Sequence, residues 1–561
     1  MAASTATFAG GDAMDAEALL VDDAVRGSVD FKDRPVLRSK TGCWKSASFI
    51  IGVEMAERFA YYGISSNLVI YLTGPLRQST AAAAANVNAW SATASLSPLL
   101  GAFVADSFLG RFRTIIAASL LYILGLGSLS VSAALNSSDS SSPPLVDVIF
   151  FFIALYLVAF AVGGHKPCLQ AFGADQFDEE NEKELRSKSS FFNWWNFCLC
   201  VSVVVGLLVL TYIQENLSWE LGFGIPCIVM CFALLVFLLG MVTYRFRVKR
   251  DERRNPFMRI TRVFMEAVKN RDATRAGIAV EEEAQSILPS EGAQFRFLDQ
   301  AILEENGEKV CSINDVEDAK AILKLLPICL ACLPFAIVYS QSTTLFTKQG
   351  TTMDRHIISS DFQIPAAALQ AFTPGSIILF VPFYERLLIP IARAIGHKPS
   401  LLQRIGSGLF LGIVCMVIAG LTERKRLETA LEHGLVDLPE ETVPMSVWWL
   451  VPQYLVMGIA DVLTFVGLQE FFYDQVPGEL KSMGLALSFC VAGIGGFLSS
   501  FLVSLVDGAT GGRGGESWLS DNLNRAHLDY FYWLLGGLNV LSLILYVYFA
   551  KSYVYSKRIT D

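Results

Sequence analysis

Long apolar runs separated by short polar breaks make up most of this chain. Twelve of the runs reach about 20 residues, the length that an α-helix needs to cross a bilayer. They lie near Ser46 to Thr73, Val87 to Leu109, Thr114 to Leu135, Val146 to Phe172, Phe191 to Ile213, Leu221 to Tyr244, Ile322 to Phe346, Phe362 to Ile389, Leu401 to Leu421, Ser446 to Phe472, Ser482 to Val506 and Tyr530 to Ala550. The pattern predicts an all-α polytopic membrane protein with twelve transmembrane helices.

The longest polar stretch falls in the middle and divides the runs into two sets of six. We therefore expect a tail at 1–45, an N-terminal six-helix bundle at 46–244, a linker at 245–320, a C-terminal six-helix bundle at 321–551 and a second tail at 552–561. Residues 1–41 are polar and lack the features of a signal peptide, which predicts a disordered tail. Two six-helix halves are typical of transporters whose substrate site lies between the halves, near the midplane.

Basic residues predict the orientation in the membrane. Lysine and arginine recur in every second loop, as at Arg111, Arg186 and Lys481, whereas the loops 136–147 and 214–220 contain neither. Cytoplasmic loops carry the excess of lysine and arginine, so both termini are expected in the cytosol. Two glycosylation sequons, at Asn136 and Asn216, fall in loops on the opposite side, in agreement with this topology.

Composition excludes a soluble globular protein and argues against several kinds of chemistry. Hydrophobic residues make up 53% of the chain and charged residues 17%. Most of the 11 cysteines lie in apolar runs, where cysteine acts as a small hydrophobe, so no disulfide framework is expected. With 5 histidines and no cluster of metal-ligand spacing, we expect no metal and no enzyme activity.

The first apolar run contains three charged residues within five positions, Glu54, Glu57 and Arg58. Their spacing places all three on one face of a helix. Each costs about 2.5 to 3.5 kcal/mol to insert, so they are expected to face a protein interior or a watered cavity. Lys166, in the fourth run, is the expected counter-ion, and the four together are formally neutral. One added proton would break that balance, which predicts proton coupling; an ion-pair knot that only locks helices together is the structural alternative.

Polar residues in the C-terminal half complete the predicted cavity. Glu470, in the tenth run, is expected to anchor a substrate ammonium or to belong to the proton path; alternatively, with Asp474 close by, it is only the last acid before a cytosolic loop. Tyr339 belongs to an unusually polar part of the seventh run that also contains Ser340, Gln341, Thr343 and Thr344. Arg58, Lys166, Tyr339 and Glu470 are the predicted substrate-binding residues.

Five motifs stand out along the chain: Glu54-x-x-Glu57-Arg58-Phe59 with Tyr61-Tyr62-Gly63, the loop from Gly101 to Arg111, Gly164-x-Lys166-Pro167, Phe172-Gly173-Ala174-Asp175-Gln176-Phe177 and Phe191-Phe192-Asn193-Trp194-Trp195. Together they resemble the motifs of the plant nitrate and peptide transporter family, the proton-dependent oligopeptide transporter branch of the major facilitator superfamily. The resemblance covers the chain from Trp44 to Lys551. It implies the major facilitator fold and a proton-coupled transporter working by alternating access, with H⁺ as the coupling ion and no cofactor.

The family's functional residues carry over onto matching positions of this sequence. The resemblance assigns proton coupling to Glu54, Glu57, Arg58 and Lys166, and a place beside substrate to Glu470. Well-known nitrate-transporting relatives have a histidine where this chain has Tyr339. Nitrate is nevertheless the first predicted substrate, small peptides the second, and plant hormones or specialised metabolites are further alternatives. A non-transporting nutrient sensor is the rival that the intact Glu54-x-x-Glu57-Arg58 motif and Lys166 argue against.

Two short motifs predict regulation and sorting. Thr114 matches a threonine that some relatives phosphorylate, although a threonine at the start of a helix is the structural alternative. Asp15, Leu19 and Leu20 form an acidic dileucine motif, which predicts a sorting adaptor as partner and the vacuolar membrane as location, with the plasma membrane as the alternative. The remaining expected partners are a small solute, protons, the lipid bilayer and a second copy in a homodimer, with no nucleic acid.

Overall fold

The structure is a computed structural model that describes residues 24–136, 143–178, 181–247, 256–274, 295, 297–298, 301, 311–356, 363–394, 400–476, 481–511 and 517–553. The N-terminal half contains α2 (Cys43–Ser65), α3 (Leu68–Thr73), α4 (Thr80–Val104), the π-helix η1 (Ala105–Leu109), α5 (Arg111–Asn136), α6 (Leu145–Ala174), α7 (Glu182–Asn216), α8 (Trp219–Leu239) and the short 3₁₀ helix η2 (Gly240–Val242). Apolar residues from all the long helices of this half form one buried core.

The C-terminal half contains more interrupted helices. It comprises α11 (Ile313–Ser340), η4 (Gln341–Thr343), α12 (Leu345–Thr351), η5 (Ala366–Ala371), α13 (Phe372–Phe383), the π-helix η6 (Tyr384–Leu388), α14 (Ile389–Ala394), α15 (Leu401–Glu432), η7 (Val447–Leu450), α16 (Val451–Asp461), the π-helix η8 (Val462–Val466), α17 (Gly467–Gln475), α18 (Lys481–Gly511) and α19 (Leu528–Ser552). The parallel pair β4 (Met353–Asp354) and β5 (Val443–Ser446) joins two loops of this half.

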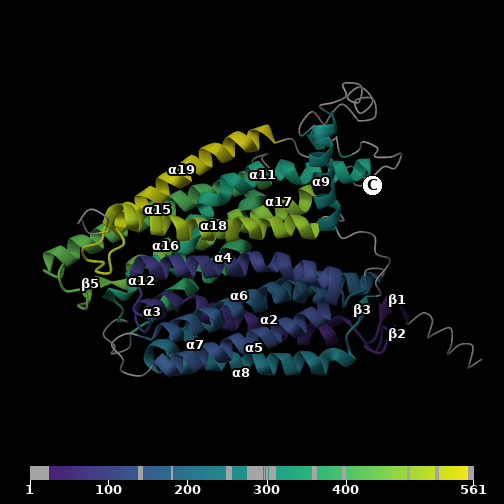
Figure 1. The fold of residues 1–561 in the computed structure, drawn as a ribbon, viewed down its shortest axis with the longest axis horizontal. Helices are drawn as coiled ribbons and strands as arrows, with labels where there is room; N and C mark the ends of the chain where they lie inside the picture. The colour runs from purple at the N-terminus through teal and green to yellow at the C-terminus, as the bar shows by residue number, and fades with distance from the viewer. Residues whose placement is uncertain are drawn as a thin grey trace, which may run out of the picture.

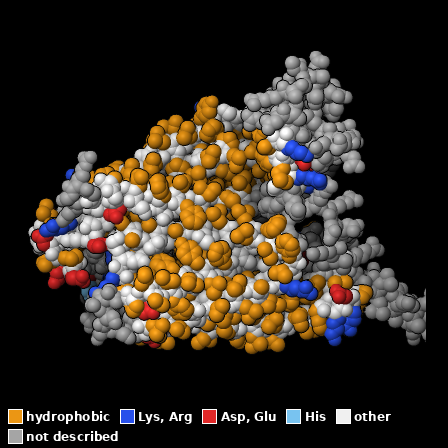
Figure 2. All heavy atoms as spheres, in the orientation of Figure 1, with side chains coloured by type: hydrophobic (Ala, Val, Ile, Leu, Met, Phe, Trp, Pro, Cys, Tyr) orange, Lys and Arg blue, Asp and Glu red, His pale blue; other side chains and the backbone are white. Residues whose placement is uncertain are grey.

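The two halves lie side by side with their long helices roughly aligned (Figure 1). Both described chain ends lie at the same end of the bundle, which we call the terminal face; the opposite end, with α3, α12 and β5, is the distal face. Hydrophobic side chains cover the sides of the helices, whereas charged side chains gather at the two ends (Figure 2). This distribution is that of a membrane-spanning bundle.

Ten helices in the described residues are long and apolar enough to cross a membrane. They correspond to ten of the twelve predicted spans. The other two predicted spans are α2, which contains Glu54, Glu57 and Arg58, and the alanine-rich α4, and both are long helices packed in the same bundle. Their polar or small residues suit an interior position, where they face other helices rather than lipid.

Close packing of α4 against α6 fixes the middle of the N-terminal half. A Cβ on Gly101 would collide with the Gly163 carbonyl, and a Cβ on Gly163 would collide with Ser97. Small residues let two backbones approach this closely. The contact lies one turn before Lys166 on α6 and so sets the depth of that residue in the bundle.

The predicted disorder of residues 1–41 is wrong for the part that the structure describes. β1 (Ala24–Val29) pairs antiparallel with β2 (Pro35–Leu37) and with β3 (Phe246–Arg247), which follows α8. Val25 of β1 and Val36 of β2 are buried. Arg245, also buried, holds this small sheet in place by donating to Glu184 at 2.7 Å and to the Thr41 carbonyl at 2.7 Å. Local apolar side chains and one buried arginine thus order a segment that composition alone marks as polar.

The linker is shorter than predicted because α11 begins at Ile313, before the predicted boundary at 321. Ser312 caps this helix with a capping box that includes Asp315. The linker helix α9 (Pro256–Thr274) lies against α11, where Arg259 pairs with Asp315 at 2.9 Å and with Asp318 at 2.6 Å. Within the described residues, α9 therefore packs on the C-terminal half, whereas β3, at the start of the linker, pairs with β1 of the N-terminal half.

Five hydrogen bonds join the two halves among the described residues, and all lie between mid-bundle and the distal face. Their donor and acceptor residues are Arg355 and Glu215 (2.9 Å), Lys348 and Thr73 (3.0 Å), Gln370 and Ser66 (2.9 Å), Thr80 and Asp521 (2.7 Å), and Asn88 and Ser499 (3.0 Å). The structure therefore has a closed distal face. We call the Arg355–Glu215 ion pair the distal latch.

Candidate functional site

The charged motif of α2 is buried and internally paired. Glu54 is 2% exposed and Glu57 0% exposed. The guanidinium of Arg58 donates from Nε to Oε1 of Glu54 at 2.8 Å and lies 3.4 Å from Oε2 of Glu57. One arginine thus holds two carboxylates, as the helical spacing predicted.

The pairing leaves these carboxylates incompletely satisfied. Both oxygens of Glu57 and Oε2 of Glu54 are buried without a hydrogen-bond partner. A buried carboxylate with free oxygens is costly as the anion. Protonation would remove that cost, so the arrangement is chemically suited to binding a proton.

Lys166 does not form the predicted ion pair with Glu54 or Glu57. Its ammonium instead lies 4.9 Å from the ring centre of Tyr61, and no carboxylate in the described residues lies within salt-bridge distance of it. The Tyr61 ring in turn stacks on Trp90, with 5.4 Å between ring centres. The prediction of a direct ion pair with Lys166 is wrong because Arg58, which lies on α2 with the two glutamates, pairs with both of them. Lys166 remains a partly exposed cation on an aromatic ring.

An acid that the sequence analysis missed lies across the interface, in the C-terminal half. Asp461 ends α16 and is followed at once by the π-helix η8. Its side chain is partly exposed and makes no hydrogen bond or ion pair within the described residues. Single π-turns are frequent at functional sites, where they redirect a side chain. Asp461 is therefore the candidate for the acid of the C-terminal half.

Aromatic residues connect Asp461 with the charged motif. Asp461 interacts electrostatically with Tyr339 of α11 and with Tyr62 of α2. Tyr339 packs edge-on against Phe465, with 5.4 Å between ring centres, and Tyr62 does the same against Tyr61 at 5.3 Å. The predicted residue Tyr339 thus lies in the site. We call the set Glu54, Glu57, Arg58, Tyr61, Tyr62, Lys166, Tyr339 and Asp461 the central site.

Glu470 does not belong to the central site in this structure. Its side chain is 54% exposed, and it accepts a hydrogen bond from Nη1 of Arg404 at 2.7 Å. Arg404 is in the first turn of α15, at the terminal face. The placement corrects the prediction that Glu470 lines the cavity and matches the structural alternative, an acid at the end of the helix.

The other predicted residues fall outside the central site. Thr114 is 4% exposed and its hydroxyl donates to the Gly110 carbonyl at 2.9 Å, so a kinase could reach it only if this turn opened. Phosphorylation therefore gains no support from this conformation. The position of Thr114 in the first turn of α5 agrees with the structural alternative, a threonine at the start of a helix. Asp15, Leu19 and Leu20 lie outside the described residues.

A second buried ion pair lies in α15, near the distal face. Glu423 and Arg426 are both 0% exposed; Nη2 and Nε of the guanidinium donate to the carboxylate at 2.6 Å and 2.9 Å. Gln349 donates to Glu423 at 2.7 Å, and Arg426 donates to Asn524 and to the Leu523 carbonyl, each at 2.7 Å. Every polar atom of this pair has a partner, which is typical of a structural network.

Comparison with known proteins finds similarity over nearly the whole chain. A model described as the POT family matches residues 112–519. The NRT1/PTR family 5.10 protein of Arabidopsis thaliana is 59% identical over 542 residues, covering 95% of this chain and 96% of the relative, and the 5.14 protein of the same plant is 52% identical over 553 residues, covering 96% and 98%. A crystal structure of an auto-inhibited POT family peptide transporter superposes with a TM-score of 0.72 at 23% identity, covering 92% of this chain and 99% of that one. The structure of the POT family transporter PepTSo gives a TM-score of 0.70 at 20% identity, covering 90% and 98%.

Proposed function

Because the chain belongs to the POT family of membrane transporters, we propose that it is a proton-coupled secondary transporter that moves a small solute by alternating access. The observation that carries the proposal is the pair of buried, incompletely satisfied carboxylates on α2, which share one arginine. The coupling ion is H⁺, taken up by Glu54 or Glu57, and no cofactor is needed.

The charge of the central site indicates how a proton and a substrate are coupled. The central site contains three acids, Glu54, Glu57 and Asp461, and two bases, Arg58 and Lys166, so the empty site carries one excess negative charge when all are ionised. An uncompensated charge is expensive inside a membrane protein. One proton neutralises the site, which favours binding one proton before the halves close over it.

The same count favours a zwitterionic solute, such as a small peptide. Its ammonium would bind at Asp461 and its carboxylate at Lys166, and it would add no net charge to a singly protonated site. Nitrate, the substrate preferred on sequence, is the second candidate, supported by the cations Arg58 and Lys166. A nitrate ion restores the excess negative charge, so it calls for two protons rather than one.

The closed distal face suggests that the substrate enters or leaves this conformation through the terminal face. We propose that the terminal face lies in the cytosol, as the distribution of basic loops favours. We further propose the vacuolar membrane as location, with Asp15, Leu19 and Leu20 as the sorting signal and the plasma membrane as the alternative. An acidic lumen would then drive solute export to the cytosol. Replacing Leu19 and Leu20 by alanine should redirect a fluorescent fusion from the vacuolar membrane to the cell surface.

Uptake of labelled substrate into proteoliposomes tests the function, with the outside acidic or neutral and a labelled dipeptide compared with nitrate. The wild type should accumulate dipeptide faster under the proton gradient. Asp461→Asn removes the proposed ammonium partner. Losing one member of a desolvated charge pair costs about 2 to 5 kcal/mol, so dipeptide affinity should fall by at least about thirtyfold.

Glu470→Gln is the matched control, because it makes the same charge change later in the same span, at an exposed position. It should leave dipeptide affinity nearly unchanged. Equal losses in Asp461→Asn and Glu470→Gln would contradict the assignment of Asp461. Nitrate uptake that keeps its gradient dependence in Asp461→Asn, with no dipeptide uptake in the wild type, would replace the zwitterion by nitrate.

A further inference from the structure

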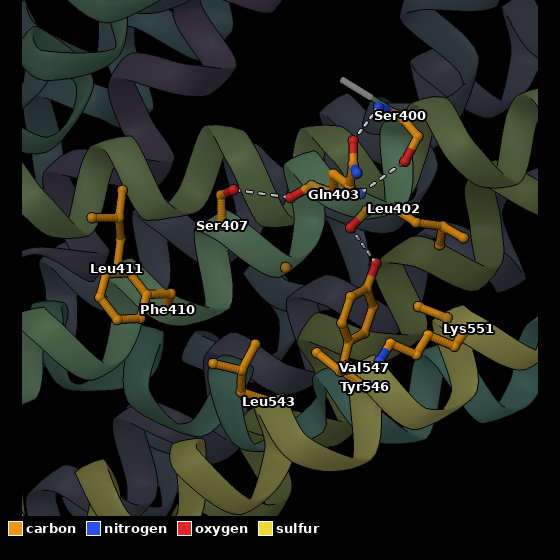
Figure 3. Close-up of a pocket in the computed structure, with 12 residues that line it drawn as sticks. Ser400, Leu402, Gln403, Ser407, Phe410, Leu411, Leu543, Tyr546, Val547 and Lys551 are labelled. Carbon is orange, nitrogen blue, oxygen red and sulfur yellow. Dashed lines mark hydrogen bonds between the residues drawn. The ribbon is translucent and has the colours of Figure 1, made fainter. Parts of the chain in front are cut away.

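A groove on the membrane-facing side of the C-terminal half has no assigned role. It has a volume of about 780 Å³ and runs between the first turns of α15 and the last turns of α19, at the terminal face. Figure 3 shows its lining residues, which within the described part of the chain come from these two helices and from Ser400, the cap of α15. The groove therefore lies apart from the central site.

Polarity changes along the groove. Ser400 and Gln403 lie at one end, Lys551 lies at the same end but across the Tyr546 side chain from them, and Phe410, Leu411 and Leu543 lie toward the other end (Figure 3). Phe410 is 55% exposed and so faces the membrane rather than the protein core. A groove with a polar end near the membrane surface and an apolar end deeper in the bilayer has the polarity of a phospholipid.

The floor of the groove is built by a specific contact between the two helices. Gly406 has no side chain, and a Cβ there would lie 3.3 Å from the Tyr546 ring. The Tyr546 hydroxyl donates to the Leu402 carbonyl at 2.8 Å. The glycine opens the space between the helices, and the tyrosine ties them together beneath it, so the groove persists as part of the packing.

The charge of the polar end defines the ligand. Among the described residues, Lys551 is the only charged one that lines the groove, and it makes no ion pair with any of them. Oε1 of Gln403 accepts from the backbone of Ser400 at 3.0 Å, whereas its Nε2 donates no hydrogen bond within the described chain. An ammonium and an amide donor suit a phosphate group with net negative charge.

We propose that this groove binds one anionic phospholipid, with its phosphate at Lys551 and Gln403 and one acyl chain along Phe410, Leu411 and Leu543. The inference rests on the orientation proposed above, because anionic lipids are concentrated in the cytoplasmic leaflet. It does not rest on the substrate or on proton coupling. Since α15 and α19 belong to the same half, the lipid anchors that half to the membrane surface without crossing the moving interface.

Native mass spectrometry of the purified full-length protein tests the proposal, with palmitoyl-oleoyl phosphatidylglycerol compared with phosphatidylcholine. The wild type should retain one phosphatidylglycerol more tightly than phosphatidylcholine. Lys551→Gln should weaken that retention about fivefold, the equivalent of about 1 kcal/mol per basic residue at an anionic surface. Val547→Trp, which fills the groove from a position 41% exposed, should reduce retention of both lipids.

Lys183→Gln is the matched control: it removes an exposed lysine at the terminal face of the other half. It should retain phosphatidylglycerol as the wild type does. Equal retention in Lys551→Gln and wild type, or equal retention of the two lipids by the wild type, would overturn the proposal. Loss of a dimer in Val547→Trp with lipid retention unchanged would overturn it too and identify the groove as an interface between two copies. Transport activity enters none of these outcomes, so failure of the proposed function would leave this test intact.

Discussion

Two buried clusters of glutamate and arginine, one in each half, differ in how completely their polar atoms are bonded. On α2, Arg58 is shared between Glu54 and Glu57, and three carboxylate oxygens have no hydrogen-bond partner. On α15, Glu423 and Arg426 bond to each other twice and to a glutamine, an asparagine and a backbone carbonyl. Similar residues at similar helical spacing thus build two different kinds of site.

The difference separates a structural role from a functional one. A buried charge is tolerated when its pairing and hydrogen bonding are complete, and a complete network resists any change of protonation. An incomplete one leaves an anion that a proton can neutralise at little structural cost. The α2 cluster is the candidate for proton coupling because three of its carboxylate oxygens lack hydrogen-bond partners; burial and charge alone do not distinguish it.

The largest expected effect is on stability, at the satisfied pair. Glu423→Gln leaves Arg426 as a buried charge without its carboxylate, and breaking a buried pair in this way costs about 3 to 5 kcal/mol. Thermal unfolding of the purified Glu423→Gln protein should show a midpoint temperature well below that of the wild type. Glu428→Gln, which breaks an exposed pair with Arg424 on the same helix, should cost less than about 1 kcal/mol. Similar losses for the two variants would contradict the comparison.

At the incomplete cluster, the effect should fall on coupling instead. Glu57→Gln removes a carboxylate whose oxygens have no hydrogen-bond partner, so the free energy of unfolding should change by less than about 1 kcal/mol. Acid-stimulated uptake into proteoliposomes should drop to the level seen without a proton gradient. Exchange of substrate across the membrane without a gradient should persist, which distinguishes lost coupling from lost binding. A variant that keeps its acid stimulation would remove Glu57 from the coupling role.

A smaller effect is expected at the distal latch. Glu215→Gln breaks the pair with Arg355. The side chain of Glu215 is 15% exposed and that of Arg355 is 24% exposed. A pair of this kind contributes about 1 kcal/mol or less, so the distal-open population should rise up to about fivefold. Distances between spin labels on the distal loops of the two halves would report the change. Glu220→Gln removes an acid that makes no ion pair in the described residues and should leave the distances unchanged.

The smallest effect is expected beside the latch, at Asp354. A hydrogen bond from His356, 2.6 Å away, holds the pKa of this exposed carboxyl below its ordinary value of 3.8. A carboxyl with a depressed pKa contributes stability that is lost only as the pH falls through that low value. Because Asp354 does not titrate near neutrality, Asp354→Asn should leave the pH dependence of the distal-open population in that range unchanged. A pronounced change at mildly acidic pH would assign the pH response of this face to Asp354.

Hydropathy was sufficient to predict most of the long helices, but not where charged residues continue them. The predicted ninth span ends at Leu421, whereas α15 continues to Glu432. The added turns contain Glu423 and Arg426, whose burial depends on partners from two other segments, α12 and the loop before α19. A single sequence shows the charges but not the partners, so an apolar window ends too early. The β1–β2 hairpin was missed for a related reason, since its pairing partner β3 is more than 200 residues away along the chain.

In the central site, the α2 motif and Tyr339 were predictable and Asp461 was not found, although a signal existed. Asp461 lies deep within the tenth apolar run, where an unpaired carboxylate is expensive. Glu470 lies near the end of that run and was chosen as an acid from the C-terminal half, a choice that the resemblance then reinforced. The two acids are nine positions apart, which would put them on opposite sides of a regular helix, but the π-helix η8 between them changes that offset, so helical spacing alone could not choose between them. The rule that singled out Glu54 would have singled out Asp461.

The small sheet at the terminal face has a consequence for the integrity of the chain. β1 and β3 close the N-terminal half on itself, because its first described strand pairs with its last. The linker helix α9, through Arg259, belongs to the other half. A backbone cut between Arg247 and Pro256 would therefore give two pieces. The first would keep the β1–β3 pairing, and the second would keep α9 packed on α11. Co-expressed as two polypeptides, they would reassemble through the contacts of α4 with α18, of α7 with η5 and α13, and of the distal face, so we expect the protein to tolerate a chain break at this place.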